Sequence, residues 1–139
     1  MLVFGVLCYA GEMIKKGKLI SNGIVLATHE KDTIAVLINL GCDIELIKPS
    51  LTKYVKTGDF VMLGLVWEMK SPTGGSRSTM EHIFQKAARQ AHNLIIDLRR
   101  TKIQDRNAIN SLEKVFTTSR SVRNLWIIDK REKIIKLKK

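Results

Sequence analysis

The sequence predicts an α/β domain in which helices flank a mixed β-sheet. Short apolar runs typical of strands alternate along the chain with longer segments whose apolar residues recur at helical spacing. Turn residues separate these segments, and 139 residues suit one compact domain with one core. Such alternation is typical of helices packed on a central sheet. We therefore expect residues 1–139 to form a single domain.

The first 28 residues predict an apolar segment and then a hairpin. Residues 1–11 are apolar, too short to cross a bilayer, and without the positive start of a signal peptide. We interpret them as a first strand or docking segment. Asn22-Gly23 lies between apolar residues within the stretch 17–28, which is typical of a hairpin turn.

A helix is expected next, from about residue 28 to residue 40. Thr28 is the candidate N-cap, and Gly41 supplies the C-terminal stop. Apolar residues at helical spacing define the face that should pack on the sheet. These residues are Ile34, Ala35, Leu37 and Ile38.

Three strands should follow the first helix. Residues 42–47 are expected as a strand that ends before Lys48-Pro49, and residues 50–58 as a loop or short helix. Residues 59–70 are rich in β-formers, and Gly64 indicates a turn or bulge that divides them into strands 60–63 and 65–70.

The second half predicts two helices and three strands. After a loop at 71–76, Ser78 or Thr79 should cap a helix over about 80–92, and residues 94–98 read as a buried central strand. The expected inward residues of this helix are Ile83, Ala87, Ala88 and Ala91. A third helix is expected over 105–117, followed by a strand at 125–128 and a lysine-rich edge strand reaching residue 137.

The positive charge is concentrated in the second half of the chain. The net charge is +11; residues 1–70 hold 8 basic and 7 acidic residues, whereas residues 71–139 hold 16 and 6. All arginines lie in the second half, and arginine binds phosphate through a planar fork of donors. This distribution favours a nucleic-acid partner, although a solvated basic face would give the same composition.

The two cysteines, Cys8 and Cys42, do not predict a metal site. Neither has a Cys or His neighbour at zinc-finger spacing. Buried thiols in a reducing cytosol are the expectation for two cysteines flanked by apolar residues.

Asp59, Glu68 and Lys70 are the candidate chemical centre. Residues two apart in a strand share a face, so Glu68 and Lys70 should point the same way. Asp59 begins the neighbouring strand, and a reversal near Gly64 would bring it beside Glu68. The alternative for Glu68 and Lys70 is an exposed cross-strand ion pair, but their apolar surroundings argue against it.

Two carboxylates that converge in this way suit a hard divalent cation. Mg²⁺ or Mn²⁺ prefers oxygen ligands and keeps several waters, so Asp59 and Glu68, with a backbone carbonyl such as that of Met69, would suffice. The metal would lower the pKa of a bound water and neutralise charge on a scissile phosphate. Lys70 would hold the attacking water or the phosphoryl oxygens.

These residues resemble the motif of the PD-(D/E)XK nuclease superfamily. Gly58-Asp59 precedes Trp67-Glu68-Met69-Lys70-Ser71-Pro72, and residues 85–98 run from a basic, Gln-containing helix into an apolar strand. Over about residues 28–100, the chain is most similar to the C-terminal tRNA-cleaving toxin domains of contact-dependent growth inhibition (CdiA-type) proteins. One departure is plain, since Gly58 stands where the motif has proline.

The resemblance implies a restriction-endonuclease-like fold and a further carboxylate. Glu30 matches the family's glutamate on the first helix, which implies a metal or catalytic role; a first-turn glutamate favoured by the helix dipole is the alternative. The resemblance also implies RNA, and tRNA in particular, as the substrate, action in the cytoplasm, and an acidic immunity protein as a partner. The residues themselves do not separate RNA from DNA.

Further polar residues are candidates for binding water or phosphate. Gln90, expected on the helix beside the site, could hold the attacking water or a phosphate, or could simply be solvated. The candidate contacts to the nucleic-acid backbone are Ser71, Thr73, Arg77, Lys86, Arg89, Arg99 and Arg100.

The predicted function is therefore a metal-dependent endonuclease of nucleic acid. The alternatives are a DNA endonuclease of a mobile element or defence system, a non-catalytic nucleic-acid-binding module, and a protein-interaction partner whose basic half is covered by an acidic protein.

Overall fold

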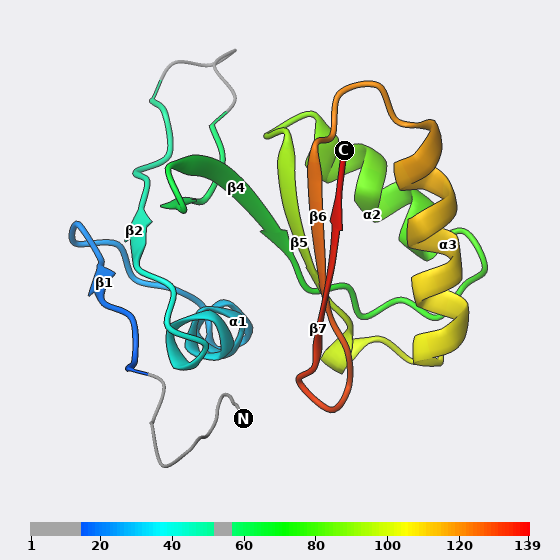
Figure 1. The fold of residues 1–139 in the computed structure, drawn as a ribbon, viewed down its shortest axis with the longest axis horizontal. Helices are drawn as coiled ribbons and strands as arrows, with labels where there is room; N and C mark the ends of the chain where they lie inside the picture. The colour runs from blue at the N-terminus through cyan, green and yellow to red at the C-terminus, as the bar shows by residue number, and fades with distance from the viewer. Residues whose placement is uncertain (1–14, 52–56) are drawn as a thin grey trace.

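The computed structural model describes residues 15–51 and 57–139, and over these residues the fold is mixed α/β (Figure 1). The described chain contains a seven-stranded sheet whose spatial order follows the sequence from β1 to β7. The strands are β1 (Leu19–Ile20), β2 (Ile44–Leu46), β3 (Phe60–Met62), β4 (Leu65–Lys70), β5 (Asn93–Asp97), β6 (Asn124–Ile128) and β7 (Ile134–Lys138). The helices are α1 (Thr28–Asn39), α2 (Thr79–Ala88), the 3₁₀ helix η1 (Leu98–Arg100) and α3 (Asp105–Thr118).

The sheet is mixed, as the sequence predicts. The pairs β1–β2, β4–β5 and β5–β6 are parallel, and the pairs β2–β3, β3–β4 and β6–β7 are antiparallel. The α/β class with helices flanking a mixed sheet is therefore confirmed. The segment 1–11 with Cys8, and most of the expected loop or short helix at 50–58, fall outside the described residues.

The two faces of the sheet bury separate apolar clusters instead of one core. Strand β5 shows why, because successive side chains of a strand point to opposite faces. Ile95 packs with Leu37 of α1 and Trp67 of β4, whereas Leu94 and its neighbours pack under α2 and α3. All residues of β5 are buried, which confirms it as the central strand.

The turn between β3 and β4 lies at the predicted glycine. Leu63 and Gly64 both have positive φ, 56° and 72°, as a tight reversal with two left-handed residues requires. The register pairs Phe60 with Trp67, and the Trp67 indole donates a 2.8 Å hydrogen bond to the carbonyl of Met62. This hairpin sets the relation between Asp59 and the residues of β4.

The predicted hairpin at Asn22-Gly23 is wrong, although the turn itself forms. Asn22 and Gly23 have φ values of 51° and 75°, but β1 pairs in parallel with β2, and the turn leads into α1 with no strand between them. The Asn22 side chain donates to the carbonyl of Leu46 at 2.8 Å, which ties the turn to β2. Ile24 then packs on the α1 face of the core and leads into the helix.

Helix α1 begins at Thr28, within the expected range, but its N-cap is Ala27 and not Thr28. The Glu30 side chain accepts a 2.9 Å hydrogen bond from the Ala27 backbone, which satisfies a free N–H at the helix start. Ala35 is exposed, contrary to expectation, and Val36 is buried instead. The packing face is thus rotated relative to the predicted one.

Helix α2 ends at Ala88, four residues before the predicted end at residue 92. Its buried residues are Met80, Phe84 and Ala87, while Ile83, Ala88 and Ala91 are only partly buried. The predicted inward face, which consists mainly of alanines, did not include the large buried side chain of Phe84.

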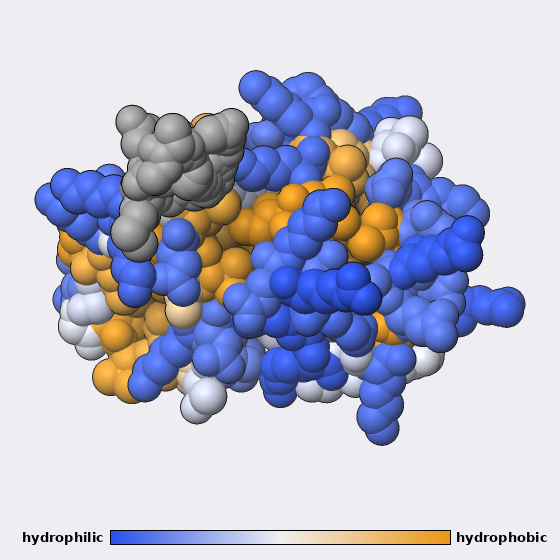
Figure 2. All heavy atoms as spheres, turned by 60° about the horizontal axis from the view of Figure 1, so that its bottom comes forward, coloured by the Kyte–Doolittle hydropathy of each residue, from blue (hydrophilic) through white to orange (hydrophobic). Residues whose placement is uncertain are grey.

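The C-terminal elements agree with the sequence. Helix α3 and strand β6 lie where expected, and β7 forms the edge of the sheet beside β6. The Lys136 ammonium lies 4.3 Å from the ring centre of Trp126. Figure 2 shows apolar surface on the side where β1 and β2 lie, while the side of α3 is mostly hydrophilic. The described helices include none with the length and apolarity needed to cross a membrane.

Candidate active site

The β3–β4 hairpin brings Asp59 beside Glu68. Asp59 lies just before β3, and its backbone N–H donates to the carbonyl of Trp67 at 2.8 Å. Its carboxylate oxygen Oδ2 accepts a 2.9 Å hydrogen bond from the backbone N–H of Met69. These two hydrogen bonds, to the residues before and after Glu68, hold Asp59 opposite Glu68 in the neighbouring strand.

Glu68 and Lys70 lie on the same face of β4, as the strand period requires. The Lys70 ammonium is 2.8 Å from Oε2 of Glu68. Glu68 is only 4% exposed, whereas a quarter of the Lys70 side chain reaches solvent, 25%. The structure thus brings Asp59, Glu68 and Lys70 together at a half-buried position.

This face of β4 is the one that carries α2 and α3. Parallel pairing places Glu68 beside Leu94 and Lys70 beside Ile96, and both partners belong to the α2–α3 cluster. Trp67 instead packs on the opposite face, under α1. Asp59 and Glu68 therefore lie among apolar neighbours, which explains why the pKa values of their carboxyl groups are raised.

Burial raises the pKa of both carboxyl groups. It lifts the pKa of Glu68 to about 7, with a further increase from the nearby Asp59, against the stabilising hydrogen bond from Lys70. Burial likewise raises the pKa of Asp59, and the Met69 N–H and Lys70 oppose the increase. The side chains of Asp59 and Glu68 are close enough to shift each other's pKa. A positive charge placed between the two carboxyl groups would stabilise their ionised forms most effectively.

The donor set of this pair fits a hard divalent cation. Two adjacent carboxylates with raised pKa values are oxygen ligands whose repulsion a cation would relieve. Within residues 15–51 and 57–139, however, no group of three or more His, Cys, Asp or Glu side chains is close enough to hold a metal ion. A cation here would have two carboxylate ligands and would keep several waters.

Within the described residues Glu30 does not form a three-carboxylate group with Asp59 and Glu68, and its metal or catalytic role stays a prediction. One of its carboxylate oxygens accepts the Ala27 N–H at the start of α1. Glu30 still contributes to raising the pKa of Asp59, so it lies within electrostatic reach of the pair. It also lines a cavity of about 230 Å³ with Lys70, Ser71 and Thr33. Its observed contact is that of a helix cap.

Gly58 explains the missing proline of the motif. A Cβ atom at this position would lie 2.5 Å from Cγ1 of Val66 and 2.8 Å from the carbonyl oxygen of Trp67. Only glycine lets the chain approach β4 this closely ahead of Asp59. The residue before the aspartate is therefore set by the packing of the hairpin.

The candidate phosphate contacts are spread over three segments. Thr73 and Arg77 are exposed in the loop after β4, and Lys86 and Arg89 are exposed on or just after α2. Gln90 is partly exposed and lies in the turn beyond α2, not on the helix as expected.

The remaining two arginines and Ser71 meet at the end of β5. The Arg100 guanidinium donates to the carbonyl of Ser71 at 3.3 Å, which joins η1 to the loop after Lys70. Arg99 is engaged within the protein, 2.8 Å from Asp97 and 3.3 Å from Glu132, which argues against its predicted phosphate contact. Arg100 is exposed, and its contact with phosphate stays a prediction.

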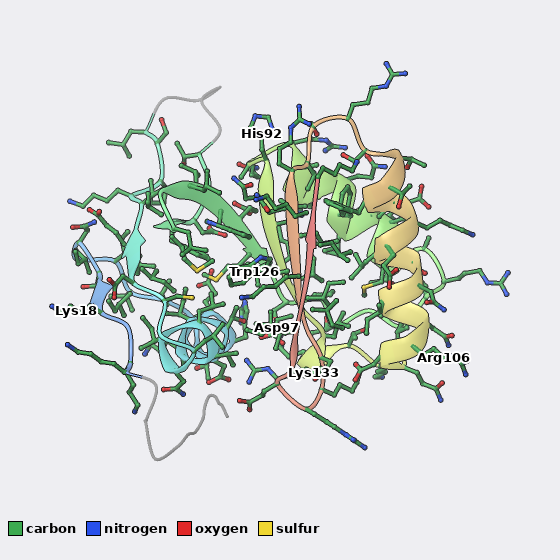
Figure 3. The ribbon with its side chains drawn as sticks, viewed as in Figure 1. Lys18, His92, Asp97, Arg106, Trp126 and Lys133 are labelled. Atoms are coloured by element: carbon green, nitrogen blue, oxygen red, sulfur yellow. The ribbon has the colours of Figure 1, made fainter. Side chains whose placement is uncertain are left out.

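Sequence reasoning missed the buried network around Asp97. Thr33 of α1 donates a 2.6 Å hydrogen bond to Asp97, which also accepts from Arg99. Figure 3 shows Asp97 beside α1, at the end of β5 opposite to His92. The only sequence signal is an aspartate at the end of an apolar run with an arginine two residues later.

Comparisons with known proteins agree with this fold. The profile of a protein family described as the contact-dependent growth inhibition CdiA C-terminal domain matches residues 56–134, so the chain belongs to that family. One solved structure is similar, the CdiA-CT/CdiI toxin and immunity complex from Burkholderia pseudomallei, with a TM-score of 0.64 and 18% identity. The match covers 88% of this chain and 100% of that chain, and it shows a shared fold. No curated protein sequence matches.

Proposed function

We propose that this chain is a toxin domain that hydrolyses phosphodiester bonds of nucleic acid, by the metal-dependent chemistry of the PD-(D/E)XK type. The observation that carries the proposal is the convergence of Asp59, Glu68 and Lys70, with the Lys70 ammonium 2.8 Å from Glu68. Membership of the CdiA C-terminal domain family supports a toxin role in the cytoplasm of a target cell.

The residues have distinct parts in the proposed reaction. Asp59 and Glu68 would hold the cation, and Mg²⁺ or Mn²⁺ would supply charge neutralisation at the phosphate and a more acidic water. Lys70 Nζ would donate a hydrogen bond to the attacking water or to a non-bridging phosphate oxygen. The water would lose a proton to solvent as its oxygen forms the new bond to phosphorus. The bond to the leaving sugar oxygen would break, and that oxygen would take up a proton from solvent.

The charge distribution supports nucleic acid as the substrate. Residues 71–139 carry 16 of the 24 basic residues, and the exposed Arg77, Lys86, Arg89 and Arg100 lie in this half. The resemblance to tRNA-cleaving toxin domains favours RNA, and tRNA in particular, over DNA. A DNA endonuclease remains the second candidate, because the same charges would bind either polymer.

An acidic immunity protein is the proposed protein partner. The similar solved structure is a complex of toxin and immunity protein, and this chain has a net charge of +11. A partner that covers the basic half would protect the producing cell by blocking access of nucleic acid.

The deciding experiment incubates the protein with total tRNA and with plasmid DNA, with Mg²⁺, with Mn²⁺ and with EDTA. We expect tRNA cleavage that needs the metal and falls at least about 10³-fold in Glu68→Ala and Lys70→Ala, since both act at the reacting phosphate. Glu113→Ala and Lys114→Ala, which replace exposed residues of α3, are the matched controls and should cleave like the wild type. Binding without cleavage under any metal would identify a non-catalytic module instead.

A further inference from the structure

A second polar cavity lies apart from the carboxylate pair, between the loop before α2 and the start of α3. Its volume is about 620 Å³, and besides Ser76 its walls carry two cations and four neutral polar residues. These residues are Arg77, Lys102, Gln104, Asn107, Asn110 and Ser111. None of the described residues that line it carries a carboxylate. The surface on this side of the molecule is mostly hydrophilic (Figure 2).

One wall of this cavity is a stripe of amide side chains on α3. Gln104 is the N-cap of α3, and Asn107 and Asn110 follow at three-residue intervals, so the three lie on one side of the helix, next to the buried stripe of Ala108 and Leu112. Asparagine is a poorer helix former than alanine because its side chain competes for backbone hydrogen bonds. The amide side chains therefore do not stabilise the helix. Each of them can, however, donate a hydrogen bond to a ligand and accept one from it.

The opposite wall is held in place by the backbone. The Thr101 hydroxyl donates to the carbonyl of Gly74, and a Cβ atom on Gly75 would be 3.4 Å from the Cβ of Lys102. These contacts dock the loop before α2 against the chain leading into α3. Arg77 and Lys102 therefore line the same cavity, and the nearby Asp105 is 3.6 Å from the ammonium of Lys130.

The same loop begins at the candidate active site. Ser71 follows Lys70 directly, and Ser76 at the cavity is six positions after Lys70 in the chain. Six residues span at most about 20 Å, and a helical nucleic-acid strand advances about 3.4 Å per nucleotide. A strand that is cleaved beside Lys70 can therefore reach this cavity within about six nucleotides.

We propose that the cavity is a nucleic-acid subsite that binds a phosphate and an adjoining base beyond the cleavage position; this inference rests on the proposed function. Arg77 and Lys102 would bind the phosphate, and Asn107 and Asn110 would hydrogen-bond the edge of the base. An acidic protein surface is the weaker fit, because carboxylates only accept hydrogen bonds and would leave the amide acceptors unused.

The test measures binding of fluorescently labelled total tRNA in EDTA, where the proposed cleavage cannot occur. The variant Asn107→Ala with Asn110→Ala should bind at least about fivefold more weakly with an unchanged salt dependence, and alanine favours the helix, so unfolding is not expected. Arg77→Ala with Lys102→Ala should lose about tenfold and lower the log–log salt slope by about two.

Two double variants on the far part of α3 and beyond serve as controls: Thr117→Ala with Thr118→Ala, and Lys114→Ala with Arg120→Ala. Lys114, Thr117 and Thr118 lie on α3, and Arg120 follows the helix. All four residues are exposed, and none of them lines the cavity. If a control weakens tRNA binding as much as its cavity counterpart, the binding is diffuse and the subsite is refuted.

Two further measurements separate the possible failures. Hydrolysis of the small diester bis(p-nitrophenyl) phosphate by the wild type tests the proposed chemistry separately from the cavity, and its absence would count against that chemistry while leaving the binding result valid. Weaker binding of polyglutamate with unchanged binding of tRNA in the cavity variants would overturn the subsite in favour of an acidic protein.

Discussion

The hydroxyl of Thr33 in α1 donates a 2.6 Å hydrogen bond to Oδ2 of Asp97 at the end of the central strand. Asp97 is 1% exposed, and its second partner, Arg99, also contacts Glu132 in the turn before β7. Burial opposes the charge on Asp97, but the hydrogen bonds from Arg99 and Thr33 outweigh it and lower the pKa of the carboxyl group. The network joins α1, β5 and the C-terminal hairpin.

Breaking this network should destabilise the fold without touching the carboxylate pair. We expect Asp97→Asn to lower the free energy of unfolding by about 3 kcal/mol at pH 7, because it leaves Arg99 without its buried countercharge. Thr33→Val should cost about 1–2 kcal/mol. Urea unfolding gives both values, with Thr117→Val, on the exposed surface of α3, as the control. An Asp97→Asn protein as stable as the wild type would contradict the assigned role.

The pH dependence of the Asp97 effect has a defined sign. Since the folded pKa lies below the unfolded value, the contribution is complete above about pH 4 and is lost as the pH falls through the folded pKa. The stability difference between wild type and Asp97→Asn should therefore shrink in acid and stay constant from pH 6 to 8.

Glu68 should show the opposite trend. Its pKa is raised from 4.5 to about 7 in the folded protein, so the folded state binds more protons between these values and its stability falls as the pH rises. In Glu68→Gln the side chain does not titrate, so this fall in stability with rising pH is absent. We expect the variant to gain stability relative to the wild type by on the order of 2–3 kcal/mol between pH 4.5 and 8. Urea unfolding at the two pH values measures the difference, and no change with pH would mean that the carboxyl group is not perturbed.

Glu30 tests whether the first helix contributes to chemistry or only to structure. Its carboxylate accepts the Ala27 N–H, and a glutamine can accept the same hydrogen bond. We expect Glu30→Gln to cleave tRNA within about threefold of the wild type, whereas Glu30→Ala should lose about 1 kcal/mol of stability. A loss of about 10³-fold in cleavage by Glu30→Gln, at unchanged stability, would restore the metal-ligand role that the family resemblance implies.

Much of the fold follows from local patterns that the sequence displays directly. The turn at Gly64, the buried run of β5 and the spacing of Glu68 and Lys70 depend on strand period and glycine conformation alone. The alignment of Asp59 with Glu68 also follows, because a short hairpin fixes its own register. These features were accessible without tertiary information.

Other features depend on contacts between distant parts of the chain. The Asn22-Gly23 turn was read as a hairpin, but β1 finds its partner in β2, with Leu19 opposite Ile44. The capping role of Glu30 required the true N-cap, Ala27, and end positions are poorly specified by local sequence. Asp97 could not be assigned because its partner Thr33 is 64 residues away.

Gly58 gives the sharpest test of the hairpin that aligns Asp59 with Glu68. A methyl group there would be 2.5 Å from Val66 and 2.8 Å from the carbonyl oxygen of Trp67, distances at which the backbone must move. We expect Gly58→Ala to lower the free energy of unfolding by about 2–3 kcal/mol and to reduce tRNA cleavage, because a shift before β3 displaces the Asp59 carboxylate. Gly75→Ala is the control for stability, since its Cβ would meet Lys102 only at 3.4 Å, an ordinary contact. Urea unfolding is measured for both variants, and the cleavage rate of Gly58→Ala is compared with that of the wild type. If Gly58→Ala were as stable as Gly75→Ala and as active as the wild type, the close approach of residue 58 to β4 would not be what positions the aspartate.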